Sequence, residues 1–204
     1  MKAPDRDLAL RLLEEGDRLN PGPWRDHSLA VARAAELLAD QLPGLDKNMA
    51  YVLGSLHDIG RRFGVTGMRH VYDGYLFLKE MGFDDAAQIN LTHSFPIKQV
   101  QAVFGKWDCT DDELSFIQSY LDSVEYTLYD RLIQLCDSLA LPEGFCLIEK
   151  RFVDVALRYG VNEFTVTKWK AYLEIKQEIE RLLGHSIYDV LPGAVEITFQ
   201  KRLV

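Results

Sequence analysis

Apolar residues recur three and four positions apart along most of the chain, which is the spacing of one face of an α-helix. Val31, Ala35 and Leu38 are one such set. Long stretches in which apolar and polar residues alternate, as in a half-buried strand, are nearly absent. The pattern therefore predicts an all-α protein. The expected helices cover residues 5–20, 24–41, 47–58, 69–81, 84–92, 111–121, 123–139, 148–159 and 165–183.

Glycine and proline mark the ends of several of these helices. The sequence NPGP at 20–23 closes the first helix, Pro43 and Gly44 end the second, and Gly60 follows the third. Residues 64–67 are expected to form a loop, and residues 95–106 irregular or short helical structure. The segment AVEITFQKRLV at 194–204 is expected to be strand-like. With no repeat or linker in the pattern, we expect one domain over residues 1–204.

Composition and charge narrow the class of protein. Apolar residues make up 48% and charged residues 26% of the chain, as in a soluble globular protein. The net charge is −8 without a long run of Lys and Arg, so we expect no binding to a nucleic-acid polymer. The three cysteines lack the paired spacing of a zinc knuckle and are expected to be free thiols. No apolar run suits a membrane span or a signal peptide, so we expect a cytoplasmic protein without membrane contact.

Four of the five histidines precede residue 94, and His57 is followed directly by Asp58. Neighbouring residues on a helix diverge by about 100°, so this pair needs partners from other helices to enclose a metal. His27, His70 and His93 lie near predicted helix ends and are of the right chemical type. A single helical histidine is more often structural than a ligand, and His185, after a helix end, is expected to be a surface or capping residue.

Asp137 interrupts the apolar sequence LIQLCDSLAL. A buried carboxylate without a partner is costly, so a metal or another cation is its natural neighbour. The alternative is a solvated stripe that Asp137 shares with Asp130 and Gln134.

The order H…HD…H…H…D resembles the HD superfamily of metal-dependent phosphohydrolases. LGSLHDIGRR surrounds the HD pair, RHVYDGYLFLKEMGF the third histidine and LIQLCDSLAL the final aspartate. The resemblance covers residues 24–140 and extends to the bacterial HD proteins that hydrolyse diadenosine tetraphosphate. It implies an HD-type helical bundle, with residues 141–204 as a helical extension packed on the core.

By this resemblance the chain holds two divalent metal ions, with Asp58 as the bridge between them. One ion takes His27, His57, Asp58 and Asp137, and the second takes His70 and His93 with the same bridge. Iron or manganese is favoured, and zinc, nickel or magnesium would also suit the ligands. Two such ions can share a hydroxide and neutralise the charge that develops on a phosphoryl oxygen.

A cation must hold the rest of the phosphate, and Arg61 directly follows the sequence HDIG. We therefore expect Arg61, with Asp58, to be catalytic and to bind substrate, because a guanidinium suits bidentate phosphate binding. Arg62, Arg69, Ser94 and Lys98 are further candidate substrate contacts. The expected partner is a small phosphorylated molecule such as a nucleotide, and a homodimer is left open.

Two other functions share these ligands. Some proteins of the HD fold are mixed-valent diiron oxygenases, and imidazole and carboxylate ligands do not separate them from hydrolases. A metal-bound sensor or scaffold without catalysis is the third alternative.

Overall fold

The computed structural model describes residues 1–199, which are mostly helical. The prediction of an all-α fold is confirmed. In chain order the elements are α1 (Arg6–Leu19), α2 (Trp24–Ala39), α3 (Lys47–Leu56), the 3-10 helix η1 (Ile59–Phe63), α4 (His70–Glu80), α5 (Asp84–Thr92), α6 (Asp111–Ser123), α7 (Leu128–Asp137), β1 (Ala140–Leu141), β2 (Gly144–Phe145), α8 (Ile148–Tyr159), α9 (Thr165–Leu183), the 3-10 helix η2 (Ile187–Asp189) and α10 (Ala194–Phe199).

Polar caps fix the start of several helices. The side chains of Asp5 and Asp46 each accept a hydrogen bond from the first turn of α1 and α3. α6 and α7 begin with capping boxes, in which Thr110 pairs with Glu113 and Thr127 with Asp130. The cap at Thr127 explains why α7 starts at Leu128, after extended backbone, and not at residue 123 as expected.

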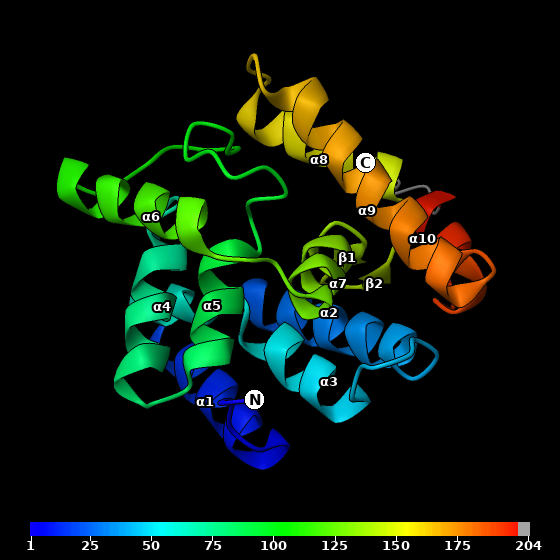
Figure 1. Cartoon of the computed structure of the whole chain (residues 1–204), viewed down its shortest axis with the longest axis horizontal. Helices are drawn as coiled ribbons and strands as arrows, with labels where there is room; N and C mark the ends of the chain where they lie inside the picture. The colour runs from blue at the N-terminus through cyan, green and yellow to red at the C-terminus, as the bar shows by residue number, and fades with distance from the viewer. Residues whose placement is uncertain (200–204) are drawn as a thin grey trace.

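Helix α7 lies at the centre of the molecule and contacts α2, α3, α5 and α9 (Figure 1). α2 packs along α3, α4 packs along α5, and α1 covers α3 and η1. The buried core between them is made of aliphatic and aromatic side chains, including Leu38, Leu53, Leu78, Phe95 and Leu132. This arrangement brings the ends of helices that are distant in sequence to the surface of α7.

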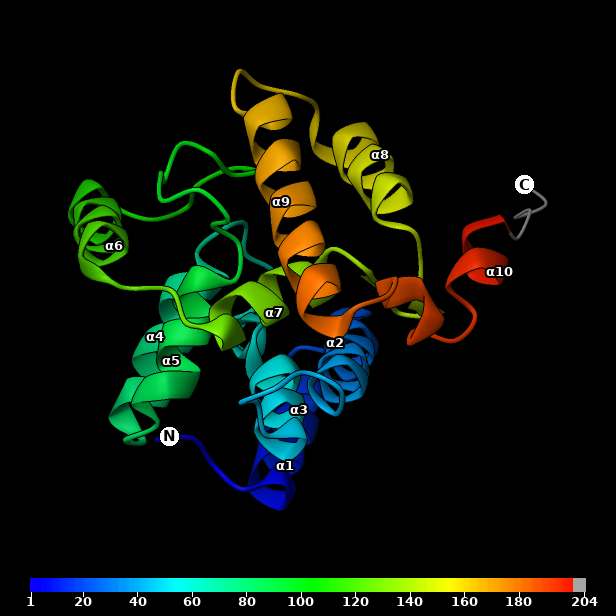
Figure 2. The ribbon, with the colours of Figure 1, turned by 45° about the vertical axis from the view of Figure 1, so that its right-hand side comes forward.

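Among the elements after residue 141, α8 and α9 stand over α7 on the side away from α1 (Figure 2). α9 packs on α7, and Tyr172, Ile175 and Ile179 are its buried face. A two-stranded antiparallel hairpin, with Ala140 opposite Phe145, connects α7 to α8. None of the described helices is long and apolar enough to cross a bilayer.

The expectation of a strand-like stretch at 194–204 is wrong over its described part, because residues 194–199 form α10. The hydroxyl of Thr198 donates to the carbonyl of Ala194 and accepts a hydrogen bond from the Leu147 amide. These contacts satisfy backbone groups locally, whereas a strand would need a free sheet edge. Residues 200–204 lie outside the described part of the chain.

Candidate metal centre

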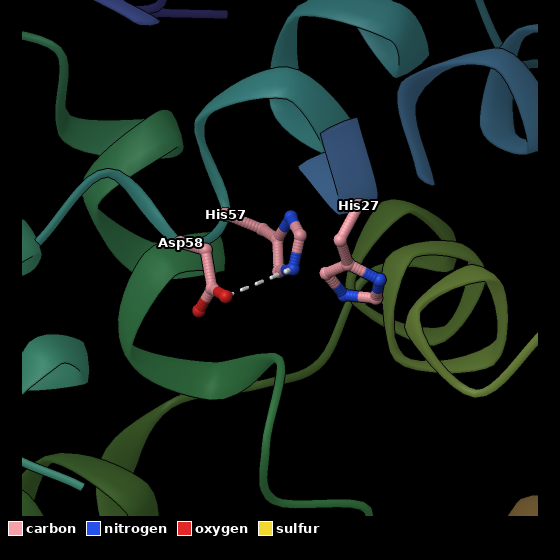
Figure 3. Close-up of side chains that lie close together, drawn as sticks. All are labelled: His27, His57 and Asp58. Carbon is pink, nitrogen blue, oxygen red and sulfur yellow. Dashed lines mark ion pairs between the residues drawn. The ribbon is translucent and has the colours of Figure 1, made fainter. Parts of the chain in front are cut away.

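Six side chains, called here the His/Asp cluster, meet where the ends of α2, α3, α4, α5 and α7 come together. His27 lies in the first turn of α2, His57 caps the end of α3, and Asp58 follows it directly. Figure 3 shows the His57 ring lying between Asp58 and His27. The structure thus brings together every residue that the sequence assigned to the metals: His27, His57, Asp58, His70, His93 and Asp137.

The cluster is compact enough for metal ligation. The Nε2 atom of His27 lies 2.9 Å from Oδ1 of Asp137, and that of His70 lies 3.1 Å from Oδ1 of Asp58. The Nε2 atom of His93 lies 3.6 Å from the same Asp58 oxygen. Three overlapping groups of ligand atoms each lie within 4.8 Å of one another: His27 with His57 and Asp58, His57 with His93 and Asp137, and Asp58 with His70 and His93.

The backbone fixes which ring nitrogen of three histidines faces the cluster. The Nδ1 atoms of His57, His70 and His93 each lie 2.7 Å from the carbonyl oxygen three residues earlier in the chain. A carbonyl can only accept, so Nδ1 carries a proton, and in the neutral imidazole Nε2 then keeps its lone pair. A histidine that binds a metal through Nε2 has this arrangement.

Two buried atoms of the cluster lack an aligned hydrogen bond within the described chain, namely Nε2 of His57 and Oδ1 of Asp58. Asp58 turns its oxygens in different directions. Oδ1 faces His70 and His93, while Oδ2 lies 3.9 Å from Nε2 of His57 and accepts a 2.6 Å hydrogen bond from Arg61. This is the orientation that a carboxylate shared by two ions requires.

The electrostatics favour a charged Asp58 and a neutral His93. Burial, the largest influence, raises the pKa of Asp58, but Arg61, His70 and His57 together outweigh it and hold that pKa well below its ordinary value. Burial, the largest influence, and the neighbouring His57 together lower the pKa of His93 to about 3. Metal binding needs a charged carboxylate and a neutral imidazole, which are the states favoured for Asp58 and His93 at neutral pH.

Two glycines let the helices that carry the ligands approach each other closely. A Cβ on Gly54 of α3 would lie 2.7 Å from the Cα of Ala32 in α2. A Cβ on Gly60 of η1 would lie 1.9 Å from the carbonyl oxygen of His70. Backbone contact therefore fixes the separation between the HD pair and its partners on α2 and α4.

The comparison with known families decides the classification. The model of the HD domain family matches residues 24–141. This chain belongs to the HD domain family. The match spans more than half of the chain and contains the whole His/Asp cluster.

A solved structure supports the HD fold. The crystal structure of the phosphodiesterase PgpH HD domain of L. monocytogenes is 17% identical, with a TM-score of 0.50 over 87% of this chain and 96% of that one. The same domain in complex with cyclic-di-AMP is 18% identical, with a TM-score of 0.49 over 95% and 99% of the two chains. No curated protein matches the sequence.

A cavity of about 800 Å³ opens beside the His/Asp cluster of this HD domain. Asp58, His27, His70, His93 and Asp137 line it, and so do Arg61 and Ser94 among the predicted substrate contacts. Burial, the largest influence, would lower the pKa of Arg61, but Asp58 outweighs it and raises that pKa. Arg61 is therefore a cation at the cavity wall, next to the predicted bridging ligand.

The other basic residues predicted to contact substrate do not line the cavity. Arg62 is buried against the ring of Phe77, with its guanidinium carbon 4.2 Å from the ring centre, and lies 3.2 Å from Glu15. Arg69 forms a bidentate pair with Glu113. Lys98 donates to the carbonyl of Val124. Each cation has a partner outside the cavity wall, so the geometry gives no support to these three contacts.

The structure also tests the alternative that Asp137 belongs to a solvated stripe with Asp130 and Gln134. Asp130 and Gln134 are fully buried, so they do not form a solvated stripe. Asp130 instead caps α7 and accepts hydrogen bonds from Thr92 and Gln88. His185 lies apart from the cluster, exposed, with Nε2 at 3.0 Å from Oε1 of Gln41.

Sequence reasoning missed Arg151 of α8 and Lys168 of α9, which both line the cavity. Lys168 carried a signal, because it falls on the apolar face of its helix, four residues before Tyr172 and seven before Ile175. A lysine on the apolar face of a helix is expected to be buried, and a buried charge needs a partner. Arg151 carried no comparable signal, since its helix has charged residues on both sides of it.

Proposed function

We propose that this HD domain protein is a metal-dependent phosphohydrolase that acts on a nucleotide or another small phosphate ester or anhydride. The observation that carries the proposal is a set of three histidines whose Nδ1 atoms are held by backbone carbonyls and whose Nε2 atoms lie 3.1–3.9 Å from the oxygens of Asp58. A buried arrangement of neutral imidazoles and charged carboxylates leaves its ligand atoms without aligned partners unless a cation binds.

The residues fit two ions. His27, His57, Asp58 and Asp137 would hold the first, and His70 and His93, with Asp58 again, would hold the second. The separate directions of the two Asp58 oxygens support this division. When bound, the ions would activate water and neutralise charge on the phosphoryl group.

Arg61 supplies the protein's own contribution to the reaction. It lies at the cavity wall and is hydrogen-bonded to Asp58, so a phosphoryl group beside the metals would also lie beside a guanidinium. Planar guanidinium groups suit phosphate oxygens. We infer that Arg61 orients the substrate and Ser94 completes the wall.

The cavity volume of about 800 Å³ lies within the usual range for sites that take small molecules of nucleotide size. α8 and α9 contribute part of its wall through Arg151 and Lys168. We therefore infer that residues 1–204 act as one unit and that the segment after residue 141 helps to select the substrate.

The test begins with elemental analysis of the purified protein. It continues with a phosphate-release screen on nucleoside mono-, di- and polyphosphates, with manganese or iron added. We expect two metals per chain, and hydrolysis that disappears in the Asp58→Asn variant while the helical circular-dichroism signal remains. Two irons with oxygen consumption and no phosphate release would favour the oxygenase instead. Metal without either reaction would favour the sensor, and no metal would refute the proposal.

A further inference from the structure

Lys168 buries an ammonium group that has no hydrogen bond or ion pair within the described chain. The residue is only 4% exposed, and Nζ lies 4.8 Å from the centroid of the Phe104 ring. Burial lowers the pKa of Lys168 to about 8, although Asp137 acts in the opposite direction. Burying a charge without a paired anion is costly. Because Lys168 lines the cavity, a bound ligand can supply that anion.

Arg151 is a second cation in the same wall. Its side chain is 18% exposed, and the nearest carboxylate oxygen is Oδ1 of Asp137, at 3.9 Å from Nη2. That distance is too long for a hydrogen bond, so the guanidinium keeps free donors. Asp137 is moreover assigned to the metals, which leaves Arg151 available for a ligand.

The cavity is basic although the whole chain is acidic. Its described wall holds five cationic side chains and only two carboxylates, Asp58 and Asp137, both of which belong to the His/Asp cluster. The cations are Arg61, Lys106, Arg151, Arg158 and Lys168. In a chain with a net charge of −8, this concentration of positive charge marks the cavity as a site for a multiply charged anion.

We propose that Lys168 and Arg151 form a second anion site, which binds a further phosphoryl group of a substrate whose reacting phosphoryl group lies at the metals and Arg61. The preferred substrate is then a molecule with at least two phosphoryl groups, which should bind more tightly than a simple monophosphate ester. This inference rests on the phosphohydrolase function proposed above. It adds α8 and α9 to the machinery that selects the substrate.

The first test measures anion binding without metals or turnover. Inorganic pyrophosphate is titrated calorimetrically into chelator-treated protein, at low salt. Wild type should bind it, and Lys168→Gln should bind at least about 10-fold more weakly, because a charge-assisted contact is lost. The matched control is Lys170→Gln, which removes an exposed lysine two residues away on α9 and should bind as wild type does. Absence of binding by wild type, or equal weakening in both variants, would overturn the proposal.

The second test compares two substrates in metal-loaded protein, AMP and ADP. Lys168→Gln should raise the KM for ADP about 10- to 100-fold more than the KM for AMP, since AMP has no second phosphoryl group. An equal effect on both substrates would mean that Lys168 contacts the reacting phosphoryl group, and would contradict the proposal. Arg151→Gln gives the same readout should Lys168→Gln not fold.

The two tests separate the failure of this inference from failure of the proposed function. Lys168-dependent pyrophosphate binding without hydrolysis of any phosphate compound would leave the anion site standing and refute the phosphohydrolase. Hydrolysis of ADP and AMP with no dependence on Lys168 or Arg151 would support the phosphohydrolase and refute the second anion site.

Discussion

Nε2 of His27 and Oδ1 of Asp137 lie 2.9 Å apart, although 110 positions separate the two residues in the chain. The contact joins the first turn of α2 to the last residue of α7. The hydrogen bond with His27 and the nearby His57 and Arg151 lower the pKa of Asp137, against the larger single effect of burial, which raises it. Asp137 is thus a charged carboxylate at neutral pH in a mostly buried site.

Replacing Asp137 by Asn tests its role as a ligand. The amide keeps the size of the side chain but loses the negative charge that a metal needs. We expect bound metal to fall below two ions per chain and kcat to fall at least about 100-fold, as for the loss of an important ligand interaction. Elemental analysis and a phosphate-release assay measure both. Full metal content in Asp137→Asn would show that the aspartate is not a ligand.

Asp130, about two turns earlier in α7, is the matched structural carboxylate. Its oxygens accept from the Thr127 amide and hydroxyl at 2.8 and 2.7 Å, and from the Thr92 hydroxyl at 2.7 Å. In Asp130→Asn an NH₂ group would face some of these donors. The free energy of unfolding should fall by about 2–3 kcal/mol, measured by urea denaturation, because buried donors lose their acceptor. Metal content should stay at the wild-type value, and a loss of metal would count against the division of roles.

Arg61 and Arg62 are adjacent but face different surroundings. Arg61→Gln should lower kcat/KM for phosphate release about 100-fold, since it removes a charge-assisted contact with the phosphoryl group. Arg62→Gln should lower the free energy of unfolding, measured by urea denaturation, by about 1–3 kcal/mol, because it removes the contacts of a buried guanidinium with Phe77 and Glu15. The assignment fails if Arg62→Gln gives the larger loss of kcat/KM.

Low pH should destabilise the metal-free protein because of His93. Its pKa falls from 6.5 to about 3 in the folded chain. Between these values the unfolded chain binds a proton that the folded chain excludes, so the free energy of unfolding decreases as the pH is lowered from 6.5 toward 3. The expected loss from this residue is about 2 kcal/mol at pH 5.

Urea unfolding of chelator-treated protein at pH 7 and pH 5 measures this effect. In His93→Gln the decrease between the two pH values should be smaller than in wild type by about the same 2 kcal/mol. Equal decreases in both proteins would mean that His93 does not titrate as the buried site requires.

Much of the fold was readable from the sequence because local signals were strong. The predicted bounds 84–92, 148–159 and 165–183 coincide with α5, α8 and α9. Gly160 and Gly184 directly follow α8 and α9 and mark the ends of these two helices in the sequence. Residues 194–199 were misread because their alternating pattern suits a strand only where a sheet edge exists, and Thr198 forms bonds that suit a helix.

The candidate site was predictable in part for a similar reason. The order of the histidines and aspartates predicted the members of the His/Asp cluster, since the sequence shows which residues are of a type that binds metals. The contacts of each arginine could not be predicted from the sequence, because they depend on partners distant in the chain. Arg69 lies beside the cluster in sequence but pairs with Glu113, whereas Arg151 lies far away in sequence yet reaches the cavity.

The close backbone contacts at Gly54 and Gly60 have a consequence for how the protein tolerates change. Core side chains can be exchanged for others of similar volume with small adjustments of neighbouring side chains. At these two glycines a single methyl group would meet rigid backbone at 2.7 and 1.9 Å and would push whole helices apart. The spacing of the predicted metal ligands therefore depends on two positions that hold no ligand. A larger residue at either glycine would abolish the metal centre, although the sequence would still contain every ligand.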